Sequence, residues 1–527
     1  MSGALRWCEG EPAVRRALED WCAGRLAAAC LRESPRRRIL RLDAPGAGPL
    51  LLKHFRAASG RRPGRGRLRG RLGIGPAHRE WRHLAALRRA GVPVPEPLGR
   101  AALAGGDLVV ATRWIEGEPL LQALGAGAPG RRAVLASLGR AVAALHAAGF
   151  VHRDLHHGNV LVADGQAWLL DVQRARRSRR QTARLADLGW LDCSLWGALS
   201  RPDRLRLWAA ALGLERPFGP RARGLLRAVG RAARLRGRRH ARSRTRRSLR
   251  PGRLYARAAA GDLRGMRLRA LEPGDLAVAA QAHAAALAAG DSRVLKDDGR
   301  SRITAVAAGA RAVVVKEAPP RGALRALADA LRGSAARRAW LGGHGLAARG
   351  IGAARPLAFL ERRILGVPVA SWLVLEDLRP AEAADACCRS LETTQVALAL
   401  GRLALALHRR EVDHGDLKAS HVYLRPGASG VEARVLDLDG VRFPRRLSDA
   451  RRLRALAQLN ASLPDRFPAE ARRLAFRRYA AALPFRGGPD LALRRVVALS
   501  LARRHRWTGR GCALADSSGA SPGPTPA

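Results

Sequence analysis

The chain carries one polar motif twice, and this repeat constrains the fold more than any other feature of its 527 residues. Residues 152–159 read HRDLHHGN and are followed by an apolar run that ends at Asp171. Residues 414–421 read HGDLKASH and are followed by a second apolar run that ends at Asp437. The two copies lie much further apart than the about 20–50 residues of a solenoid repeat. We therefore expect two complete domains of one kind.

The first copy matches the pattern H-R-D-L-x-x-x-N, which marks the catalytic loop of protein kinases. Asp154 and Asn159 occupy the Asp and Asn positions of the pattern. The second copy retains Asp416 but has His421 where the pattern has Asn. No A-P-E or activation-loop pattern follows either copy, which argues against a protein kinase. The motif predicts phosphoryl transfer to some other class of acceptor.

The lysines support this prediction independently. The chain has only four, at positions 53, 296, 316 and 418, whereas its other basic residues are arginines. Lys53 ends the apolar run Pro49–Leu52, and Lys316 ends the run Ala312–Val315. A kinase-like fold places a lysine on its third strand, where a compact ammonium group reaches the α- and β-phosphates of the nucleotide. Lys53 and Lys316 each precede their copy of the motif by about 100 residues.

The first domain has every residue type that phosphoryl transfer needs, in the expected order. Lys53 is expected to hold the nucleotide phosphates, and Glu80 on the following helix to orient Lys53 through an ion pair. Asp154 is expected to accept the proton of the acceptor hydroxyl. Asn159 and Asp171 are expected to bind Mg²⁺, which prefers hard oxygen ligands. ATP and Mg²⁺ are thus the expected cosubstrate and cofactor.

The second domain is less complete. The alignment of residues 79–81 with residues 338–340 puts Ala339 at the position of the helix Glu, so Lys316 lacks its expected partner. Asp416 remains as the candidate catalytic residue, and Asp437 as a candidate metal ligand. His421 replaces the Asn, and a neutral imidazole is a poorer Mg²⁺ ligand than a carbonyl oxygen. Two interpretations stay open: a slow second active site, or a pseudokinase domain kept for scaffolding or substrate binding.

The predicted fold class is α+β, with two tandem protein-kinase-like bilobal domains. Each has a small β-rich N-terminal lobe and a helical C-terminal lobe. We expect the first domain over residues 1–220, an Arg-rich linker over 221–270, the second domain over 271–510 and a disordered tail over 511–527. The linker prediction rests on the stretch 221–261, which is dense in arginine and contains no acidic residue.

Two local expectations concern the N-terminal lobes. Residues 1–35 look helical, before a strand over 38–42. Neither lobe has a clear G-x-G-x-x-G loop to cover the nucleotide, and the turns at 45–48 and 297–299 are the nearest candidates.

The charge of the chain restricts its partners. With 96 Lys and Arg against 43 Asp and Glu, the formal net charge is +53, which favours phosphorylated glycolipids and anionic membrane surfaces. Nucleic acid is not expected, because 3 Tyr and 8 Phe provide few stacking platforms and no binding signature occurs. The 7 scattered cysteines are typical of a reduced, cytoplasmic protein. No apolar run is long enough to predict a membrane span.

Beyond the two loops, several segments resemble the lipopolysaccharide kinases of Gram-negative bacteria. In the first half these are HRDLHHGN, LLDVQRAR, REW and AGVPVPEPLG. In the second half they are RGIGAARPLA, HGDLKASHVYL, VLDLDGVRF and DARRLRALAQLNASLP. The resemblance implies ATP- and Mg²⁺-dependent phosphorylation of a Kdo or heptose hydroxyl in the lipopolysaccharide inner core. It also implies a peripheral location on the cytoplasmic face of the inner membrane, with no obligate protein partner. Heptose kinases of this family are known with His at the loop Asn position, so the resemblance leaves His421 compatible with activity.

Two other functions remain open. The first is a small-molecule kinase of the aminoglycoside or choline type, but the pockets of such enzymes are usually acidic and this chain is strongly basic. The second is a non-catalytic, membrane-associated regulator built from two pseudokinase domains. The complete set of catalytic residue types in the first domain argues against this alternative. Measured ATP turnover would distinguish a kinase from a non-catalytic regulator.

Overall fold

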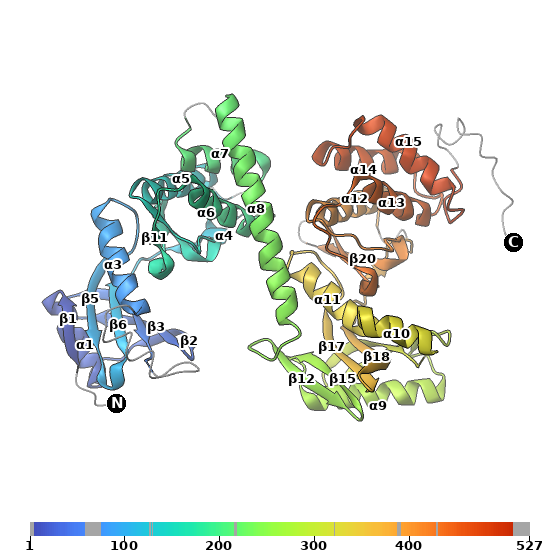
Figure 1. Cartoon of the computed structure of the whole chain (residues 1–527), viewed down its shortest axis with the longest axis horizontal. Coiled ribbons are helices and arrows are strands. Elements are labelled where there is room, and N and C mark those ends of the chain that lie inside the picture. Colours follow the sequence, from blue (N-terminus) through green and yellow to red (C-terminus); the bar gives the residue numbers. More distant parts are fainter. Residues whose placement is uncertain are drawn as a thin grey trace. The chain divides into compact units, whose positions relative to one another are not determined.

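The computed structural model describes residues 5–57, 75–125, 128, 130–214, 219–320, 322–386, 391–427 and 430–509. The chain forms two compact units, residues 1–239 and 240–527 (Figure 1). Each unit has a lobe built on a mainly antiparallel sheet and a helical lobe, so the predicted α+β class with two kinase-like bilobal domains is confirmed. Within the described residues, no helix combines the length and hydrophobicity needed to cross a membrane.

The N-terminal lobe of unit 1 is a six-stranded sheet in the order β1-β5-β6-β4-β3-β2. Its strands are β1 (Arg6–Gly10), β2 (Ala29–Ser34), β3 (Arg37–Ala44), β4 (Gly48–Phe55), β5 (Pro97–Ala102) and β6 (Leu108–Arg113). Helix α1 (Pro12–Cys22) buries Val14 and Leu18 against this sheet, and helix α3 (Pro76–Arg89) follows β4. Pro76 at the first turn of α3 and the left-handed Gly91 just beyond it set the ends of α3.

The helical lobe of unit 1 surrounds the first motif copy. Its helices are α4 (Leu120–Ala123), α5 (Arg131–Ala147), α6 (Gln181–Ser194), α7 (Arg201–Leu212) and the first part of α8 (Pro220–Arg247). Its short strands are β7 (Glu118–Pro119), β8 (Phe150–Val151), β9 (Val160–Ala163), β10 (Gln166–Leu169) and β11 (Arg176–Arg177). The motif lies between β8 and β9, and Asp171 directly follows the β9–β10 hairpin. Residues of α3, α5 and α6 share one hydrophobic core with these strands.

The N-terminal lobe of unit 2 is a seven-stranded sheet in the order β12-β13-β17-β18-β16-β15-β14. The strands are β12 (Tyr255–Ala260), β13 (Leu263–Leu268), β14 (Val294–Asp297), β15 (Arg302–Ala308), β16 (Arg311–Ala318), β17 (Pro356–Ile364) and β18 (Val367–Glu376). Helices α9 (Pro273–Ala289), α10 (Ala323–Arg332) and α11 (Ala335–Ala347) accompany this sheet. Trp340 of α11 is fully buried in the core of the unit.

The helical lobe of unit 2 repeats the arrangement of unit 1. It contains α12 (Thr393–Arg409), α13 (Asp449–Ser462), α14 (Ala469–Ala482) and α15 (Gly488–Leu501). The strands β19 (Glu382–Ala383), β20 (Val422–Gly427) and β21 (Gly430–Val435) form a small sheet beside the second motif copy. Asp437 follows β21 as Asp171 follows β10.

The segment 221–270 differs from the expected linker. It forms helix α8 and strands β12 and β13, and the boundary between the two units falls inside α8. Small residues of α8 explain its packing, since Ala222, Val229 and Ala233 are buried. Gly189 of α6 allows the close approach, because a Cβ there would lie 2.7 Å from the backbone nitrogen of Ala233. The expected disordered tail, 511–527, lies outside the described residues.

The expected helix over residues 1–35 is also wrong in part. Among the described residues 5–35, α1 is the only helix, and β1 and β2 flank it. Strand β2 lies at the edge of its sheet with almost every side chain exposed, so no apolar alternation marks it in the sequence.

Candidate functional site

Lys53 and Glu80 meet in the interior of unit 1. Lys53 lies on β4, paired with Ile39 of β3 and Val110 of β6, so the sheet fixes its backbone on both sides. Glu80 lies on the buried face of α3 with its side chain 1% exposed. The two side chains form an ion pair, as expected for an oriented strand lysine. Asp171 Oδ1 lies 3.8 Å from the Lys53 ammonium group, so Glu80 is the nearer partner.

Asp171 lies where two cations converge. Its backbone is left-handed, with φ 56°, which starts the short 3-10 turn Val172–Arg174 directly after it. Arg37 Nη1 donates to Asp171 Oδ1 at 3.2 Å. Burial alone would raise the pKa of Asp171, but Lys53 and Arg37 outweigh burial and hold the pKa below its usual value. Asp171 is therefore ionised at neutral pH, as a metal ligand must be.

The first motif copy is tied to the segment that ends at Asp171. His152 Nε2 lies 2.9 Å from the carbonyl oxygen of Leu170, and the Leu170 amide donates to the carbonyl oxygen of Asn159 at 2.9 Å. Asn159 Nδ2 donates to the backbone carbonyl oxygen of Asp154 at 2.9 Å. This bond uses the amide nitrogen of Asn159 and leaves its Oδ1 as an acceptor that can bind a metal. The residues of unit 1 thus fit Mg²⁺, with one carboxylate and one amide oxygen as its protein ligands.

Asp187 supports the loop and was not predicted from the sequence. It lies on α6, is 4% exposed, and accepts the backbone amides of His152 at 2.5 Å and Arg153 at 2.7 Å. Arg153 has φ 66°, which is strained for a residue with a side chain, and these two bonds hold it there. The available signal was an acidic residue inside the apolar stretch Leu185–Leu191.

Lys316 in unit 2 pairs with a different acid. Ala339 of α11 is buried where Glu80 lies in unit 1, and Lys316 Nζ instead lies 2.7 Å from Asp437 Oδ1. Burial would raise the pKa of Asp437, but the Lys316 cation outweighs burial and lowers it. Asp437 has the same left-handed backbone as Asp171, with φ 52°. The residue expected to bind a metal is therefore already the partner of the lysine.

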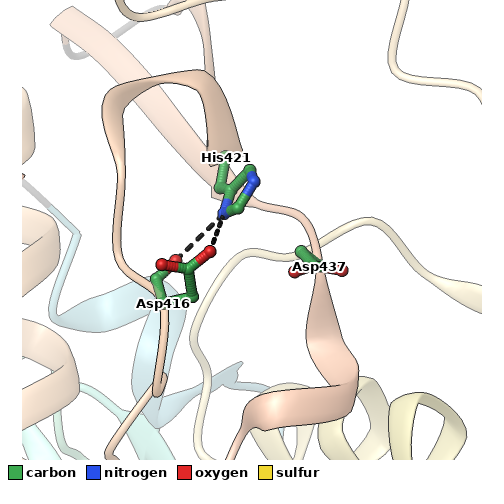
Figure 2. A group of neighbouring side chains, drawn as sticks. All are labelled: Asp416, His421 and Asp437. Atoms are coloured by element: carbon green, nitrogen blue, oxygen red, sulfur yellow. Dashed lines mark hydrogen bonds and ion pairs between the residues drawn. The ribbon is translucent and has the colours of Figure 1, made fainter. Parts of the chain in front are cut away.

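Asp416, His421 and Asp437 form a candidate metal cluster in unit 2, with one ligand atom of each lying within 4.8 Å of the others. Figure 2 shows His421 between the two aspartates, with its contacts to Asp416 dashed. His421 Nδ1 lies 3.0 Å from the Asp416 backbone oxygen and 3.5 Å from its Oδ2. An Nδ1–H that donates to this carbonyl leaves Nε2 as the lone-pair nitrogen for a metal. His421 thus takes the loop position of Asn159 but offers a nitrogen in place of an oxygen.

The two loop aspartates have different neighbours. Asp154 Oδ2 accepts from Arg174 Nη1 at 3.2 Å. Asp416 Oδ2 lies 3.0 Å from the ammonium group of Lys418, and Asp416 Oδ1 accepts a hydrogen bond from Gln458 of α13. Asp416 is therefore held by one cation and one amide donor, whereas Asp154 is held by one cation.

The two candidate nucleotide-covering turns occupy different positions in the sheets of the two units. Residues 297–299 lie where β14 turns to β15, the first hairpin before the Lys316 strand. Residues 45–48 join β3 to β4, which is the second hairpin of the three strands that end with the Lys53 strand. In unit 1 the corresponding turn is at 35–36, between β2 and β3, and it is next to Arg37, which contacts Asp171. By its place in the sheet, the turn at 35–36 therefore corresponds to the turn at 297–299, and the turn at 45–48 does not.

The fold and the paired lysine, glutamate and aspartate side chains define a protein-kinase-like phosphotransferase. The family model of the lipopolysaccharide kinase (Kdo/WaaP) family matches residues 24–210 and again residues 329–478. These ranges cover more than half of the chain, one range for each unit, and the chain belongs to this family. Membership implies a kinase that uses ATP.

Three solved structures each match part of the chain. "WaaP in complex with acyl carrier protein" is 21% identical, with a TM-score of 0.30, over 41% of this chain and 91% of that chain. An aminoglycoside-3'-phosphotransferase of type VIII is 16% identical, with a TM-score of 0.28, over 42% of this chain and 100% of that one. The Rio2 kinase of Chaetomium thermophilum is 17% identical, with a TM-score of 0.28, over 42% and 76%. No curated protein sequence matches the chain.

Proposed function

We propose that unit 1 transfers the γ-phosphoryl group of ATP to a sugar hydroxyl of the lipopolysaccharide inner core, on Kdo or heptose. The observation that carries the proposal is the Lys53–Glu80 ion pair. Because Glu80 is the nearer partner of Lys53, Asp171 remains available to a metal. The family match separately supports a sugar acceptor.

Each residue has one role in this proposal. Lys53 holds the α- and β-phosphates, and Glu80 orients it. Asp171 and the Oδ1 of Asn159 would hold Mg²⁺, which would supply positive charge beside the transferred group. Asp154 accepts the proton of the sugar hydroxyl as the new P–O bond forms and the bond from the γ-phosphorus to ADP breaks. The Oδ2 of Asp154 accepts a charge-assisted hydrogen bond from Arg174, which directs the carboxylate.

Unit 2 is proposed to bind nucleotide but to turn over slowly. Lys316 competes with a metal for Asp437, and His421 offers a nitrogen to a cation that prefers oxygen. The same two features support a scaffolding role for this unit, and the side-by-side mutants described in the Discussion separate the alternatives.

We also propose that the protein works on the anionic cytoplasmic surface of the inner membrane. Two features support this location. Residues 221–250 contain arginines and no acid, and most of them lie in α8. On α10, Leu324, Leu327 and Leu331 are 87%, 58% and 85% exposed, at the spacing of one helix face. A basic helix and an exposed apolar helix face together favour anionic lipid at an interface.

Liposome flotation tests the membrane proposal. Binding to vesicles with anionic lipid, lost at high salt and weakened by Leu324→Glu, is the expected result. Equal binding to neutral and anionic vesicles that salt does not change would refute it.

Phosphate transfer tests the proposed reaction. Purified full-length protein is incubated with radiolabelled ATP, Mg²⁺ and core oligosaccharide, and the product is mapped by mass spectrometry. We expect one added phosphate on Kdo or heptose, absent with Asp154→Asn. Transfer to an aminoglycoside or choline but not to the oligosaccharide would overturn the acceptor, and no ATP turnover at all would favour the pseudokinase regulator.

A further inference from the structure

A pocket of about 970 Å³ in unit 1 is lined mainly by arginines. It lies between α3, the first motif loop, the segment after Asp171 and α8. Phe150, Ala86, Gln173 and Ala175 complete its walls, and no acidic residue lines it in the described part of the chain. The cationic and histidine side chains are Arg79, Arg82, His83, Arg153, Arg174, Arg176, Arg177 and Arg236.

Rigid elements hold these side chains in place. Arg176 and Arg177 lie on β11, which pairs with β8. Arg177 lies over the ring of Phe150, with its guanidinium carbon 5.4 Å from the ring centre, and Arg236 lies over Trp190 at 4.8 Å. Stacking on a ring orients a guanidinium group without neutralising its charge. The ring contacts therefore leave the positive charges of Arg177 and Arg236 in place beside the pocket.

Unit 2 provides an internal control for the origin of this charge. At the positions of Arg82, Arg153, Arg174 and Arg177 in unit 1, unit 2 has Leu341, Gly415, Gly440 and Phe443. Both units share one composition bias towards arginine. If this bias alone accounted for the arginines of unit 1, arginine would be expected at the matching positions of unit 2 as well.

The corresponding space in unit 2 is also closed. Gly342 replaces His83, and a Cβ at Gly342 would lie 2.3 Å from the carbonyl oxygen of Leu438. In unit 1 the His83 ring occupies this contact, with Nδ1 2.9 Å from the carbonyl oxygen of Val172. Arg338 matches Arg79 and forms an ion pair with Asp329 at 2.9 Å. Unit 2 thus lacks four of the arginines that line the basic pocket of unit 1.

We propose that this pocket binds a multiply phosphorylated ligand. Like charges gathered in one concavity repel each other unless several anionic groups enter together, and arginine binds phosphate oxygens in a bidentate manner. The pocket is concave and of ligand size, whereas a membrane surface is flat. Arg174 lines the pocket and also contacts Asp154 Oδ2 at 3.2 Å, which joins the pocket to the reacting centre. The ligand is the phosphate-bearing part of the acceptor, a step that rests on the proposed function.

Calorimetric titration with inorganic pyrophosphate tests the pocket itself. A saturating non-hydrolysable ATP analogue occupies the nucleotide sites during the titration. We expect Arg82→Leu and Arg177→Phe, which introduce the unit 2 residues at exposed positions, to weaken pyrophosphate binding about tenfold or more each. The matched control is Arg140→Leu on the exposed face of α5, which should bind like the wild type. Equal pyrophosphate affinity in all four proteins would overturn the proposal.

Steady-state kinetics then identifies the source of the phosphate groups. With phosphorylated core oligosaccharide, Arg177→Phe should raise KM about tenfold with kcat nearly unchanged, and with phosphatase-treated oligosaccharide it should change neither. If pyrophosphate affinity falls but KM does not change, the occupant is a separate phosphate compound and the assignment to the acceptor is wrong. If the wild type phosphorylates neither oligosaccharide, the proposed function fails while the pyrophosphate result stands.

Discussion

Glu80→Ala is expected to give unit 1 the arrangement of unit 2. Glu80 is the nearer partner of Lys53, and Asp171 is the next acid, with its Oδ1 3.8 Å from the ammonium group. In unit 2, where Ala339 takes the place of the glutamate, the matching distance from Lys316 to Asp437 is 2.7 Å. Without Glu80 we expect Lys53 to move onto Asp171 and to compete with Mg²⁺ for it.

The two distances give the size of the effect. At an effective dielectric constant of about 20, shortening the contact from 3.8 to 2.7 Å strengthens the attraction by about 2 kcal/mol. A metal that binds Asp171 must overcome this additional attraction, and 1.4 kcal/mol is about tenfold in affinity. We therefore expect the Mg²⁺ concentration for half-maximal activity to rise about 20-fold.

The assay is a Mg²⁺ titration of phosphate transfer at fixed ATP and acceptor. Because removing one partner of a buried ion pair destabilises a fold by about 3–5 kcal/mol, Glu80→Gln is measured beside it and the Tm of each variant is recorded. Glu96→Ala is the matched control, since it removes an exposed glutamate that pairs with Arg113 at 2.7 Å. A folded Glu80→Ala protein whose Mg²⁺ requirement stays within about twofold of the wild type would refute the argument.

Three further outcomes follow from the same geometry. Asp154→Asn should lower the rate of transfer by about 10²–10⁴ with ATP affinity retained in calorimetry, because it removes the proton acceptor but no phosphate ligand. Asp171→Ala should remove nearly all activity and Asp437→Ala little of it when both are assayed on one acceptor; the opposite order would make unit 2 the main active site. Asp187→Ala should lower both the rate and the Tm, since two buried loop amides lose their acceptor at about 1–3 kcal/mol each; an unchanged pH–rate profile and Tm would contradict its positioning role.

Much of the fold could be predicted because apolar periodicity marks the buried elements. The strands that carry Lys53 and Lys316 and the helices around Trp81 and Trp340 lie where the sequence indicates. The region 221–270 was misread because arginine obscures the pattern of its buried alanines. Ala222, Val229, Ala233 and Ala241 recur at helical spacing, a signal of a packed helix that charge density alone hides.

The site could be predicted as far as its motifs extend. The sequence identified Lys53, Glu80 and Asp171 by spacing, and the structure brings them together. It could not reveal which acid would meet Lys316, because that depends on how far a lysine side chain reaches once its partner is missing. Asp187 was missed for a related reason, since a single acid on a helix reads as an exposed charge until its two loop amides are located.

The differences between the two units are coupled through the loop backbone. Arg153 holds a left-handed φ of 66° that a side chain disfavours, and Asp187 stabilises it through two amide bonds. In unit 2, α13 has Ala455 at the position of Asp187, and Gly415 replaces Arg153 with φ 84°, which glycine adopts without strain. The loop therefore keeps its shape without the buried acid, but it also loses the arginine that lines the basic pocket. Unit 2 thus retains the backbone of a phosphotransferase loop, whereas four arginines of the basic pocket in unit 1 are replaced there by Leu341, Gly415, Gly440 and Phe443.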